Sequence, residues 1–315
     1  MITRSPVYLT KGANMKNIFI VNPKAGAEDN LQIIKEKIAQ AGIEESCEIY
    51  LTQSKGDATV YASEYIDKHP DEQIRLIACG GDGTISEVFN AGIHRENVSV
   101  SVFPCGSGND FVKVFGGPER FADLKKIIEA PASKIDVMKV GDRYSINVVN
   151  FGFDTTVAIQ VNEDRDRTGK GSKSSYTKGI IKALITSMKN QFKVYADGKL
   201  LNPDGVSLLC TLGNGQYVGG SFKCSPRARL DDGLIEVCVV RTISRLKFVK
   251  LIGAYVDGSY LDDPGMKDIL VYTQAKKVDV EAPEGFAFSL DGEIIYNNHF
   301  TVEIEEKALN LAVPE

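Results

Sequence analysis

The chain has 315 residues, of which 43% are hydrophobic and 25% charged, and it carries a formal net charge of −5 at pH 7. This composition is typical of a soluble globular protein and excludes a largely disordered chain, while the length favours two domains with a cleft between them. The acidic balance gives no general attraction to nucleic acid or anionic lipid, so any such contact must be local.

The cysteines and histidines narrow the possible chemistry. Six cysteines are scattered without a Cys-x-x-Cys pair, and several lie in apolar runs, so we expect buried, reduced thiols and a cytoplasmic protein. The three histidines, His69, His94 and His299, are not at ligand spacing from one another or from a cysteine. Neither a zinc site nor a Ser-His-Asp triad is expected, so the chemistry must rest on carboxylates.

Membrane-spanning and signal segments are not predicted. No apolar run approaches the ~20 residues that a bilayer requires, and the N-terminus lacks the apolar core of a signal peptide. The first strand pattern begins only after Met15. Residues 1–15 are therefore expected to be a disordered lead-in or the product of an upstream start codon.

From Lys16 the chain alternates strand-like and helix-like segments. Strands are predicted at 17–21, 47–51, 74–79 and 98–103, and amphipathic helices at 31–41 and 57–68. This alternation predicts a doubly wound α/β domain whose parallel sheet has helices on both faces. Ligands of such sheets bind beyond the carboxyl ends of the strands, so the polar and glycine-rich segments at these ends should converge on one crevice.

The central stretch is Gly80-Gly81-Asp82-Gly83-Thr84, which follows the strand at 74–79 and leads into a helix. We expect glycine here because the backbone turns sharply with positive φ and approaches a ligand closely. The free N–H groups and the dipole of the following helix would favour phosphate. A purely structural turn is the alternative, but an aspartate beside a phosphate needs a cation, which favours a nucleotide and Mg²⁺.

Two known phosphate loops are excluded by the sequence. No Gly-x4-Gly-Lys-Ser/Thr motif occurs, and the central stretch continues to Ser86 where a dinucleotide fingerprint requires Gly or Ala. The central stretch is therefore neither a P-loop nor a Rossmann fingerprint.

After about Asp136 the sequence pattern changes. Short runs rich in Val and Ile, separated by turn residues, cover 134–140, 144–151, 206–212, 234–240, 276–280 and 300–304. They predict a second, mainly antiparallel β domain over 136–305. Helical periodicity appears within it at 176–192 and 244–255.

One segment departs from the acidity of the chain. Between 165 and 189 the only acid is Asp166, whereas the basic residues are Arg165, Arg167, Lys170, Lys173, Lys178, Lys182 and Lys189. A helical wheel separates three of these lysines from an apolar half formed by Tyr176, Ile180, Ile181, Leu184, Ile185 and Met188. The segment could be a helix that covers the β domain, or it could contact an anionic membrane surface.

Five motifs with glycines, carboxylates and asparagines follow one another along the chain. They are Asn22-Pro23-x-x-Gly26, Gly80 to Thr84, Pro104-x-Gly106-Ser107-x-Asn109-Asp110-Phe111, Pro226-x-Ala228-x-x-Asp231-Asp232-Gly233 and Asp291-Gly292-Glu293. Alone, the last would suggest no more than a hairpin tip. Together, their order resembles the diacylglycerol kinase catalytic-domain family, and within it the soluble bacterial diacylglycerol and lipid kinases, over nearly all of the chain after Met15. Gly213-Asn214-Gly215 and the run 219–222 are also similar to the family's segment before Asp-Asp-Gly.

This resemblance implies an ATP-dependent kinase that transfers the γ-phosphoryl group to the hydroxyl of diacylglycerol or a related lipid, giving phosphatidic acid for phospholipid synthesis. It also implies an α/β nucleotide-binding domain similar to those of phosphofructokinase and NAD kinase, at 16–135. A β-sandwich-like lipid-acceptor domain would occupy 136–305, and residues 306–315 would return to the first domain.

The resemblance also assigns site residues. The nucleotide would be held by Asn22, Thr52, Gly81, Asp82, Gly83 and Thr84, with Ser107 nearby. Asp82 and Asp110 would organise Mg²⁺ and its waters. The catalytic group would be Asp291, Glu293 and Asp82, with Asp291 taking the proton from the lipid hydroxyl. A second, structural Mg²⁺ would bind the Asp232 side chain and the backbone carbonyls of Arg229 and Leu234. The chain departs from the family pattern at Ser107, where Thr is commoner, and at Ser86, where Asn is usual.

The assignment is chemically coherent, because one cation and a few carboxylates can neutralise charge, position the groups and accept a proton. Kinases that act on phosphatidylglycerol, a sphingoid base or NAD are the nearest alternatives, although the runs 109–111 and 231–233 favour the lipid branch over NAD kinase. A catalytically silent nucleotide-binding module is an alternative of another class, but it should lack Asp82, Asp291 or Glu293. The expected partners are ATP and a lipid, with peripheral contact at the inner face of the membrane through the basic helix, and no nucleic acid. Which lipid, and whether the chain forms a homodimer, are left open.

Overall fold

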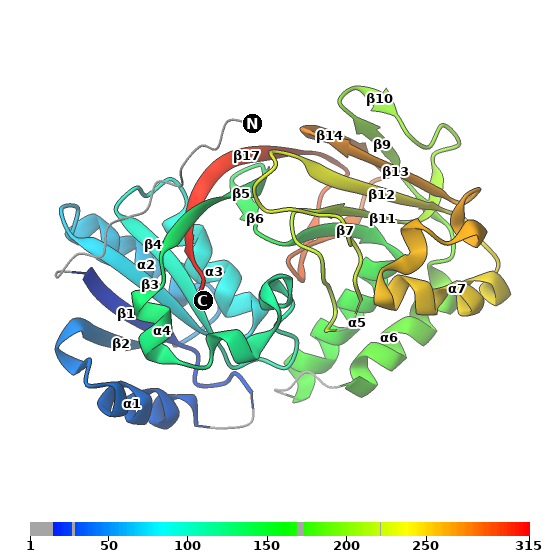
Figure 1. Ribbon diagram of the computed structural model, residues 1–315. Coiled ribbons are helices and arrows are strands. Elements are labelled where there is room, and N and C mark those ends of the chain that lie inside the picture. The colour runs from blue at the N-terminus through cyan, green and yellow to red at the C-terminus, as the bar shows by residue number, and fades with distance from the viewer. Residues whose placement is uncertain (1–14, 27–28, 169–172, 221) are drawn as a thin grey trace. The chain divides into compact units, whose positions relative to one another are not determined.

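The protein is represented by a computed structural model that describes residues 15–26, 29–168, 173–220 and 222–315 (Figure 1). The expected lead-in before Met15 lies outside the described residues, as does Lys170 of the basic segment. The chain divides into two compact units, Met1–Asp136 with Glu306–Glu315, and Val137–Glu305. In the described part of the chain, none of the helices combines the length and the apolar character needed to cross a bilayer.

The first unit is built on a parallel sheet with the strand order β2-β1-β3-β4-β17. Its strands are β1 (Met15–Val21), β2 (Cys47–Leu51), β3 (Gln73–Gly80), β4 (Val98–Pro104) and the last part of β17 (His299–Ala312). β3 and β4 are buried almost throughout, as expected of parallel strands covered on both faces. Leu311 of β17 pairs with Val100 of β4, so residues after 305 complete this sheet.

Helices cover both faces of this sheet. They are α1 (Asn30–Ala41), α2 (Asp57–Lys68), α3 (Asp82–Gly92) and α4 (Leu124–Glu129), with the short turns η1 (Glu44–Ser46), η2 (Phe111–Phe115) and η3 (Pro118–Phe121). The connection from β1 to β2 runs in one direction along the sheet, and those from β2 to β3 and β3 to β4 run in the other. Right-handed crossovers therefore put α2 and α3 on one face and α1 on the opposite one, where it packs against α4 (Figure 1). The predicted doubly wound α/β domain is confirmed.

A buried arginine ties β3 to α4. Arg75 is 2% exposed, and its guanidinium donates hydrogen bonds to the carbonyls of Ile127, Ile128 and Ala130 at 2.9, 2.7 and 2.9 Å. These carbonyls lie at the C-terminal end of α4, where a helix leaves carbonyls without intrahelical partners, although that of Ile127 also accepts from the Ala130 N–H at 3.4 Å. Burial lowers the Arg75 pKa to about 10, so the side chain stays charged at neutral pH and its charge complements the helix dipole.

The second unit is a sandwich of antiparallel sheets. One sheet has the order β13-β12-β11-β7-β15-β16, with β8 also on β11, and the other contains β10-β9-β14 and the first part of β17, together with the β5–β6 pair. The strands are β5 (Ala132–Val140), β6 (Arg143–Ser145), β7 (Val148–Gly152), β8 (Asn190–Gln191), β9 (Lys193–Ala196), β10 (Lys199–Leu200), β11 (Val206–Gly213), β12 (Ile235–Arg241), β13 (Leu270–Ala275), β14 (Lys277–Glu281), β15 (Ala287–Leu290) and β16 (Glu293–Tyr296).

Alternation along the strands separates two cores in this unit. Ile235, Val237 and Val239 of β12 face the other sheet in the sandwich core, whereas Cys238 and Val240 face helices. The helices are α5 (Phe153–Thr168), α6 (Lys173–Thr186) and α7 (Arg245–Asp257), followed by the turns η4 (Ser259–Leu261) and η5 (Pro264–Met266). The predicted antiparallel β-sandwich is confirmed, with a helical layer on one of its outer faces.

Several sequence predictions fail in this unit. The strand predicted at 144–151 is two strands, because the N–H groups of Ile146 and Asn147 donate to a carboxylate instead of to a neighbouring strand. α5 was not predicted at all. The helix predicted at 176–192 ends at Thr186, because Ser187 and Asn190 hydrogen-bond each other at 2.8 Å and Phe192 enters the sandwich core. The helix predicted at 244–255 is confirmed as α7.

The two faces expected for the basic helix also differ from the structure. Ile180, Leu184 and Met188 pack in the core beneath α6, but Ile181 and Ile185 are 53% and 68% exposed. The buried face of α6 is therefore centred on Ile180, Ala183 and Leu184, and Ile181 and Ile185 lie outside it. Two lysines of the expected solvated face form ion pairs: Lys178 with Asp164 at 3.5 Å and Lys182 with Glu163 at 3.6 Å.

Candidate functional site

The first part of the candidate site lies where the strand order of the first unit reverses. In the sheet β1 lies between β2 and β3. The chain goes from β1 to β2 on one side and then crosses to β3 on the other side, so the carboxyl ends of β1 and β3 form a topological switch point. Asn22 follows β1, and the central stretch 80–84 follows β3. The N–H of Asn22 donates to the Cys79 carbonyl at 2.9 Å, and the N–H of Thr52, after β2, donates to the Val21 carbonyl at 2.9 Å.

Side chains and glycines lock these strand ends together. The Asn22 amide donates to the Thr84 hydroxyl at 3.1 Å, which joins the turn after β1 to the first turn of α3. Gly26 has φ +71°, and a Cβ there would be 2.4 Å from the Cys105 carbonyl oxygen. A Cβ on Gly106 would be 2.5 Å from the Gly81 Cα. The segments after β1, β3 and β4 are therefore in backbone contact.

The glycines of the central stretch do not have the positive φ that the sequence suggested. Gly81 has φ −92°, and neither Gly80 nor Gly83 is in the left-handed region. Gly80 is required by packing, because a Cβ there would be 2.4 Å from the Thr84 hydroxyl. Gly83 is different: it is exposed, and a Cβ there would meet no atom within 4 Å. Among the described residues, neither packing nor backbone conformation requires glycine at this exposed position.

The first turn of α3 presents its N–H groups at this point. The first intrahelical bond runs from the Ile85 N–H to the Gly81 carbonyl at 3.0 Å, so those of Asp82, Gly83 and Thr84 precede it. Such groups, together with the positive end of the helix dipole, favour an anion. The space next to Gly83 leaves the backbone at this turn open to approach.

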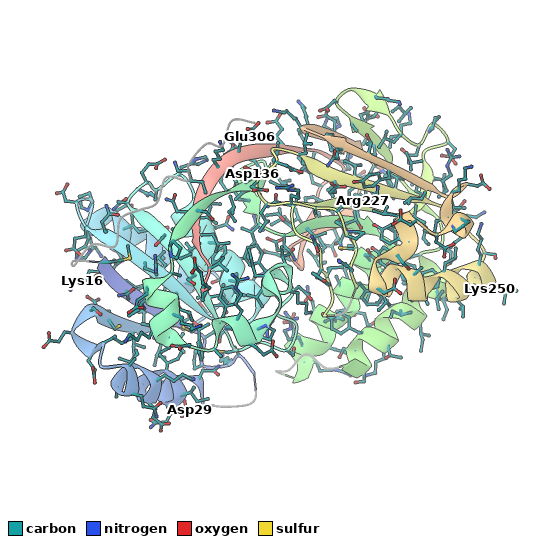
Figure 2. The ribbon with its side chains drawn as sticks, in the orientation of Figure 1. Lys16, Asp29, Asp136, Arg227, Lys250 and Glu306 are labelled. Atoms are coloured by element: carbon teal, nitrogen blue, oxygen red, sulfur yellow. The ribbon has the colours of Figure 1, made fainter. Side chains whose placement is uncertain are left out.

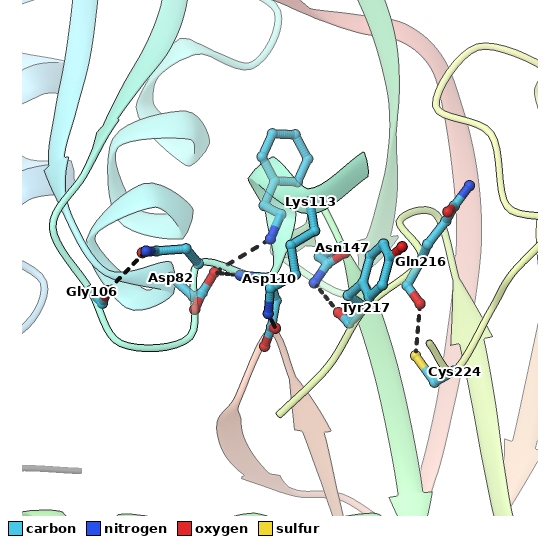
Figure 3. A network of polar contacts seen from close by, with 10 residues as sticks. Asp82, Gly106, Asp110, Lys113, Asn147, Gln216, Tyr217 and Cys224 are labelled. Atoms are coloured by element: carbon cyan, nitrogen blue, oxygen red, sulfur yellow. Dashed lines mark hydrogen bonds and ion pairs between the residues drawn. The ribbon is translucent and has the colours of Figure 1, made fainter. Parts of the chain in front are cut away.

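Two carboxylates lie beside this helix terminus (Figure 3). Asp82 Oδ1 accepts hydrogen bonds from the N–H groups of Asp110 at 2.7 Å and Phe111 at 3.4 Å. Asp110 is buried, and its Oδ1 lies 2.7 Å from Lys113 Nζ. Burial, and then the charge of Asp110, raise the pKa of Asp82 to about 6. The two acids therefore repel each other, and the charge of Lys113, which contacts Asp110, partly offsets the rise in the Asp82 pKa.

The donor set fits a divalent cation. Besides Asp82 and Asp110, the buried Asn109 Oδ1 has no hydrogen-bond partner among the described residues, although its amide nitrogen donates to the Gly106 carbonyl at 2.8 Å. A Cβ on Gly108 would be 2.7 Å from Asp82 Oδ2, so this glycine keeps the space beside that oxygen open. No group of three acidic, histidine or cysteine ligands occurs among the described residues. Mg²⁺ needs only one or two carboxylates, because phosphates and water fill the rest of its coordination shell.

The second part of the candidate site is the hairpin tip between β15 and β16. Asp291 and Gly292 have φ 49° and 89°, the signs of a type I′ two-residue turn, so the hairpin expected from Asp-Gly alone is present. The Asp291 carboxylate accepts four hydrogen bonds: from Ser145 Oγ at 2.7 Å and from the N–H groups of Ile146, Asn147 and Val148 at 2.9, 3.1 and 2.9 Å. Three of these bonds end on Oδ1 and one, from Ile146, ends on Oδ2, which leaves acceptor capacity on Oδ2.

Asp291 thus shapes the turn between β6 and β7. That turn continues into the glycine-rich segment after β11, because the Asn147 carbonyl accepts from the N–H groups of Asn214 and Gly215, and the Asn147 amide donates to the Tyr217 carbonyl at 2.8 Å (Figure 3). A Cβ on Gly215 would be 1.9 Å from Asn147 Oδ1. Burial is the largest influence on the Asp291 carboxyl and raises its pKa, against the opposing effect of its hydrogen bonds.

The remaining predicted residues lie apart from these networks. Ser107 is exposed at the tip of the segment after β4. Glu293 begins β16 and forms an ion pair with Arg143 at 3.0 Å. In the loop before β12, Asp232 Oδ1 accepts from the Leu234 N–H at 3.1 Å, which brings together two of the three residues expected at the second Mg²⁺ site. The third, Arg229, uses its side chain to pair with Asp231 at 3.3 Å.

Three features of the site were missed by the sequence reasoning. Lys113 follows Asp110 by three residues, a spacing that could have predicted their ion pair. The turn 145–148 has no local motif that points to Asp291. Asp154, in the first turn of α5, has its pKa raised to about 6 by burial and accepts a hydrogen bond from the Tyr255 hydroxyl at 3.0 Å.

Known proteins share both parts of this arrangement. Residues 16–140 match the family described as "Diacylglycerol kinase catalytic domain", and residues 147–313 match the "YegS C-terminal NAD kinase beta sandwich-like domain". The chain is 31% identical over 283 residues to a protein of Bacillus subtilis (strain 168) named "Diacylglycerol kinase", covering 87% of this chain and 88% of that protein. A protein of Alcanivorax borkumensis named "Probable lipid kinase YegS-like" is 29% identical over 269 residues, covering 85% and 87%.

A solved structure supports the same assignment at the level of fold. The crystal structure of a diacylglycerol kinase from Bacillus anthracis str. Sterne has a TM-score of 0.68 to this chain at 24% identity, covering 96% of this chain and 98% of the other. The two family matches lie in the same order as the two kinds of sheet, parallel first and antiparallel second. The chain therefore belongs to the diacylglycerol kinase catalytic-domain family, which includes the YegS-like lipid kinases.

Proposed function

We propose that this protein is an ATP-dependent lipid kinase that transfers the γ-phosphoryl group to the hydroxyl of diacylglycerol or a related lipid, giving phosphatidic acid. Family membership supports a kinase that uses ATP. The acceptor is the proposed part, and diacylglycerol is favoured because the Bacillus subtilis relative carries that name.

The phosphate chain of ATP is proposed to bind at the first turn of α3. The open space at Gly83 is the observation that carries this proposal, because glycine there is explained by neither backbone strain nor packing. The N–H groups of Asp82, Gly83 and Thr84 would donate to phosphate oxygens. Asn22 would hold Thr84 in place through its 3.1 Å hydrogen bond, while Thr52 and Ser107 would border the nucleotide.

Asp82 and Asp110 are the residues proposed to hold Mg²⁺, with Asn109 Oδ1 as a third oxygen that could accept from a bound water. When bound, the cation would neutralise charge on the transferring phosphoryl group. The chain's own contribution is to keep the two carboxylates in place: the Asp110 and Phe111 N–H groups fix Asp82, and Lys113 fixes Asp110. The Asp232 side chain, with the carbonyls of Arg229 and Leu234, remains the proposed second, structural site.

The proton of the acceptor hydroxyl is proposed to go to the carboxylate pair Asp291 and Glu293. Three of the four hydrogen bonds end on Asp291 Oδ1, so Oδ2, which accepts from the Ile146 N–H, is the oxygen proposed to take the proton, and Ser145 is the one donor whose hydroxyl can rotate to an alternative acceptor. The Ser145 hydroxyl offers a second route, in which it would accept the proton of the lipid and pass its own proton to Asp291. Glu293 would support Asp291, held in place by its ion pair with Arg143 at 3.0 Å.

The proposed function is tested by phosphate transfer from ATP to diacylglycerol, phosphatidylglycerol, sphingosine, undecaprenol and NAD, with the lipids in mixed micelles. We expect diacylglycerol to be phosphorylated with the highest kcat/KM and Asp82→Asn to abolish the reaction. Preferential phosphorylation of NAD or another lipid would replace the proposed acceptor. ATP binding without transfer to any acceptor would indicate a catalytically silent nucleotide-binding module.

A further inference from the structure

Most of the exposed apolar side chains gather on two helices of the second unit. Of the seven large hydrophobic residues that are exposed in the described part of the chain, five lie on α6 and α7: Ile181 (53% exposed), Ile185 (68%), Leu246 (79%), Val249 (63%) and Val256 (36%). The spacing is four residues on α6, and three and then seven residues on α7, which places each set on one face of its helix. We call these five residues the α6–α7 apolar surface.

The two rows of exposed side chains meet. Arg245, the first residue of α7, donates from Nε to the Leu184 carbonyl at 2.6 Å and from Nη2 to the Ile185 carbonyl at 3.2 Å. This contact holds the beginning of α7 against the end of α6, and Leu246 is the next residue along α7. The apolar surface is therefore shared by the two helices instead of being two separate strips.

Basic residues border this surface. The sequences of α6 and α7 contain six lysines and arginines but a single acid, Asp257 at the end of α7, although the whole chain has a net charge of −5. Lys250 is exposed, and Figure 2 shows it extending outward from α7. Lys178 and Lys182 remain 57% and 42% exposed despite their ion pairs with α5.

Exposed aliphatic side chains with basic residues on the same two helices complement the surface of an anionic bilayer. They suit a second copy of the same chain poorly, because a twofold contact would bring the same basic residues face to face. The charge pattern therefore selects lipid over self-association.

We propose that Ile181, Ile185, Leu246 and Val249 insert into the surface of an anionic bilayer while Lys250 and the neighbouring basic side chains contact its headgroups. The proposal rests on the proposed function only for the choice of partner, since an enzyme that acts on a lipid must meet it at a membrane. It differs from the contact predicted from the sequence, which was limited to the basic segment 165–189 and did not include α7.

The test compares two variants in co-sedimentation with vesicles of phosphatidylcholine that contain phosphatidylglycerol. Ile181→Gln/Ile185→Gln/Leu246→Gln/Val249→Gln removes the proposed contact with a residue that favours helix, at positions where more than half of each residue is exposed. Val60→Gln/Tyr296→Gln, at the other two exposed hydrophobic residues, is the matched control. We expect the quadruple variant to lose at least about 100-fold in vesicle partitioning, and the control to bind as the wild type does. Equal binding of wild type and quadruple variant would overturn the proposal.

Two further measurements separate the possible outcomes. If sedimentation velocity shows a wild-type dimer and a monomeric quadruple variant, the surface is a contact between copies and the proposal is wrong. Phosphorylation of a short-chain, water-soluble diacylglycerol distinguishes this inference from the proposed function. Normal turnover of that acceptor with lost vesicle binding supports the inference. If wild type phosphorylates no acceptor but its vesicle binding still depends on the four residues, the proposed function fails and the inference stands.

Discussion

Replacing Gly83 with alanine should move stability and nucleotide affinity in opposite directions. A methyl group at this position meets no atom within 4 Å, and the residue lies in the first turn of α3 with φ outside the left-handed region. Alanine is favoured over glycine in a helix by roughly 0.5–1 kcal/mol. The free energy of unfolding of Gly83→Ala should therefore rise by about that amount, or stay unchanged.

Nucleotide binding should fall in the same variant. The methyl group would occupy the space that lets a phosphate reach the N–H groups of the first turn, and a hydrogen bond to a charged group contributes about 1.5–3 kcal/mol. Loss of one such bond corresponds to a decrease in ATP affinity of roughly 10- to 150-fold. Isothermal titration calorimetry with Mg²⁺ and ATP, and urea unfolding of the same preparations, measure both effects.

Two other glycines serve as controls for this experiment. Gly253 is also helical with no atom within 4 Å of an added Cβ, but it lies on α7, so Gly253→Ala should raise stability without changing ATP affinity. Gly80→Ala should destabilise the protein, because its Cβ would be 2.4 Å from the Thr84 hydroxyl oxygen. If Gly83→Ala binds ATP as tightly as the wild type, the proposed phosphate site at α3 is wrong.

Three further predictions concern other parts of the molecule. Asp291→Asn should lower turnover about 10²-fold or more if Asp291 is the base. The same variant should have a free energy of unfolding in urea that is lower by about 2–4 kcal/mol, because an amide nitrogen would face N–H donors. Unchanged stability would contradict the four-donor geometry. Arg75→Met should destabilise the protein by about 3–5 kcal/mol, since three buried carbonyls lose their donor; a change below about 1 kcal/mol would show that the guanidinium is dispensable. The pKa of Asp154 is raised to about 6, which means that the folded state favours the protonated acid. The stabilising contribution of this residue to the free energy of unfolding is therefore fully present below pH ~4 and is lost as pH rises through about 6. Asp154→Asn should therefore gain roughly 1–3 kcal/mol relative to wild type between pH 4.5 and 7.5, and a difference in unfolding free energy that does not vary with pH would refute the assignment.

The first unit could be predicted from the sequence because its signals are local. Apolar runs ending in polar or glycine-rich turns predicted β1 to β4 and the helices between them, and strand direction alone then puts Asn22 beside the turn at 80–84. The reason given for the glycines was wrong, because it took backbone conformation as the cause. Gly80 instead makes room for Thr84 one helical turn later, a packing relation that no turn propensity expresses.

The second unit was harder to predict because its decisive contacts are remote in sequence. Asp291 binds the turn at 145–148, more than 140 residues earlier, and this contact divides the predicted strand 144–151. The exposed position of Ile185 could not be found with a helical wheel either, since the wheel assumes one buried face per helix. Arg245, some 60 residues later, holds α7 at the end of α6 and leaves Ile185 on the outer face.

The strand β17 constrains how the protein can be made on the ribosome. The parallel sheet of the first unit needs Leu311 beside Val100, and the Ser101 hydroxyl donates to the Ala312 carbonyl at 2.8 Å. Residues 137–305 must be synthesised in between, which takes roughly 8–34 s at about 5–20 residues per second. During that time the nascent first unit has an unpaired edge at β4, which is a surface for aggregation. Chaperone binding to this edge should therefore persist until residues 306–312 have joined the sheet, long after residues 15–136 have been synthesised.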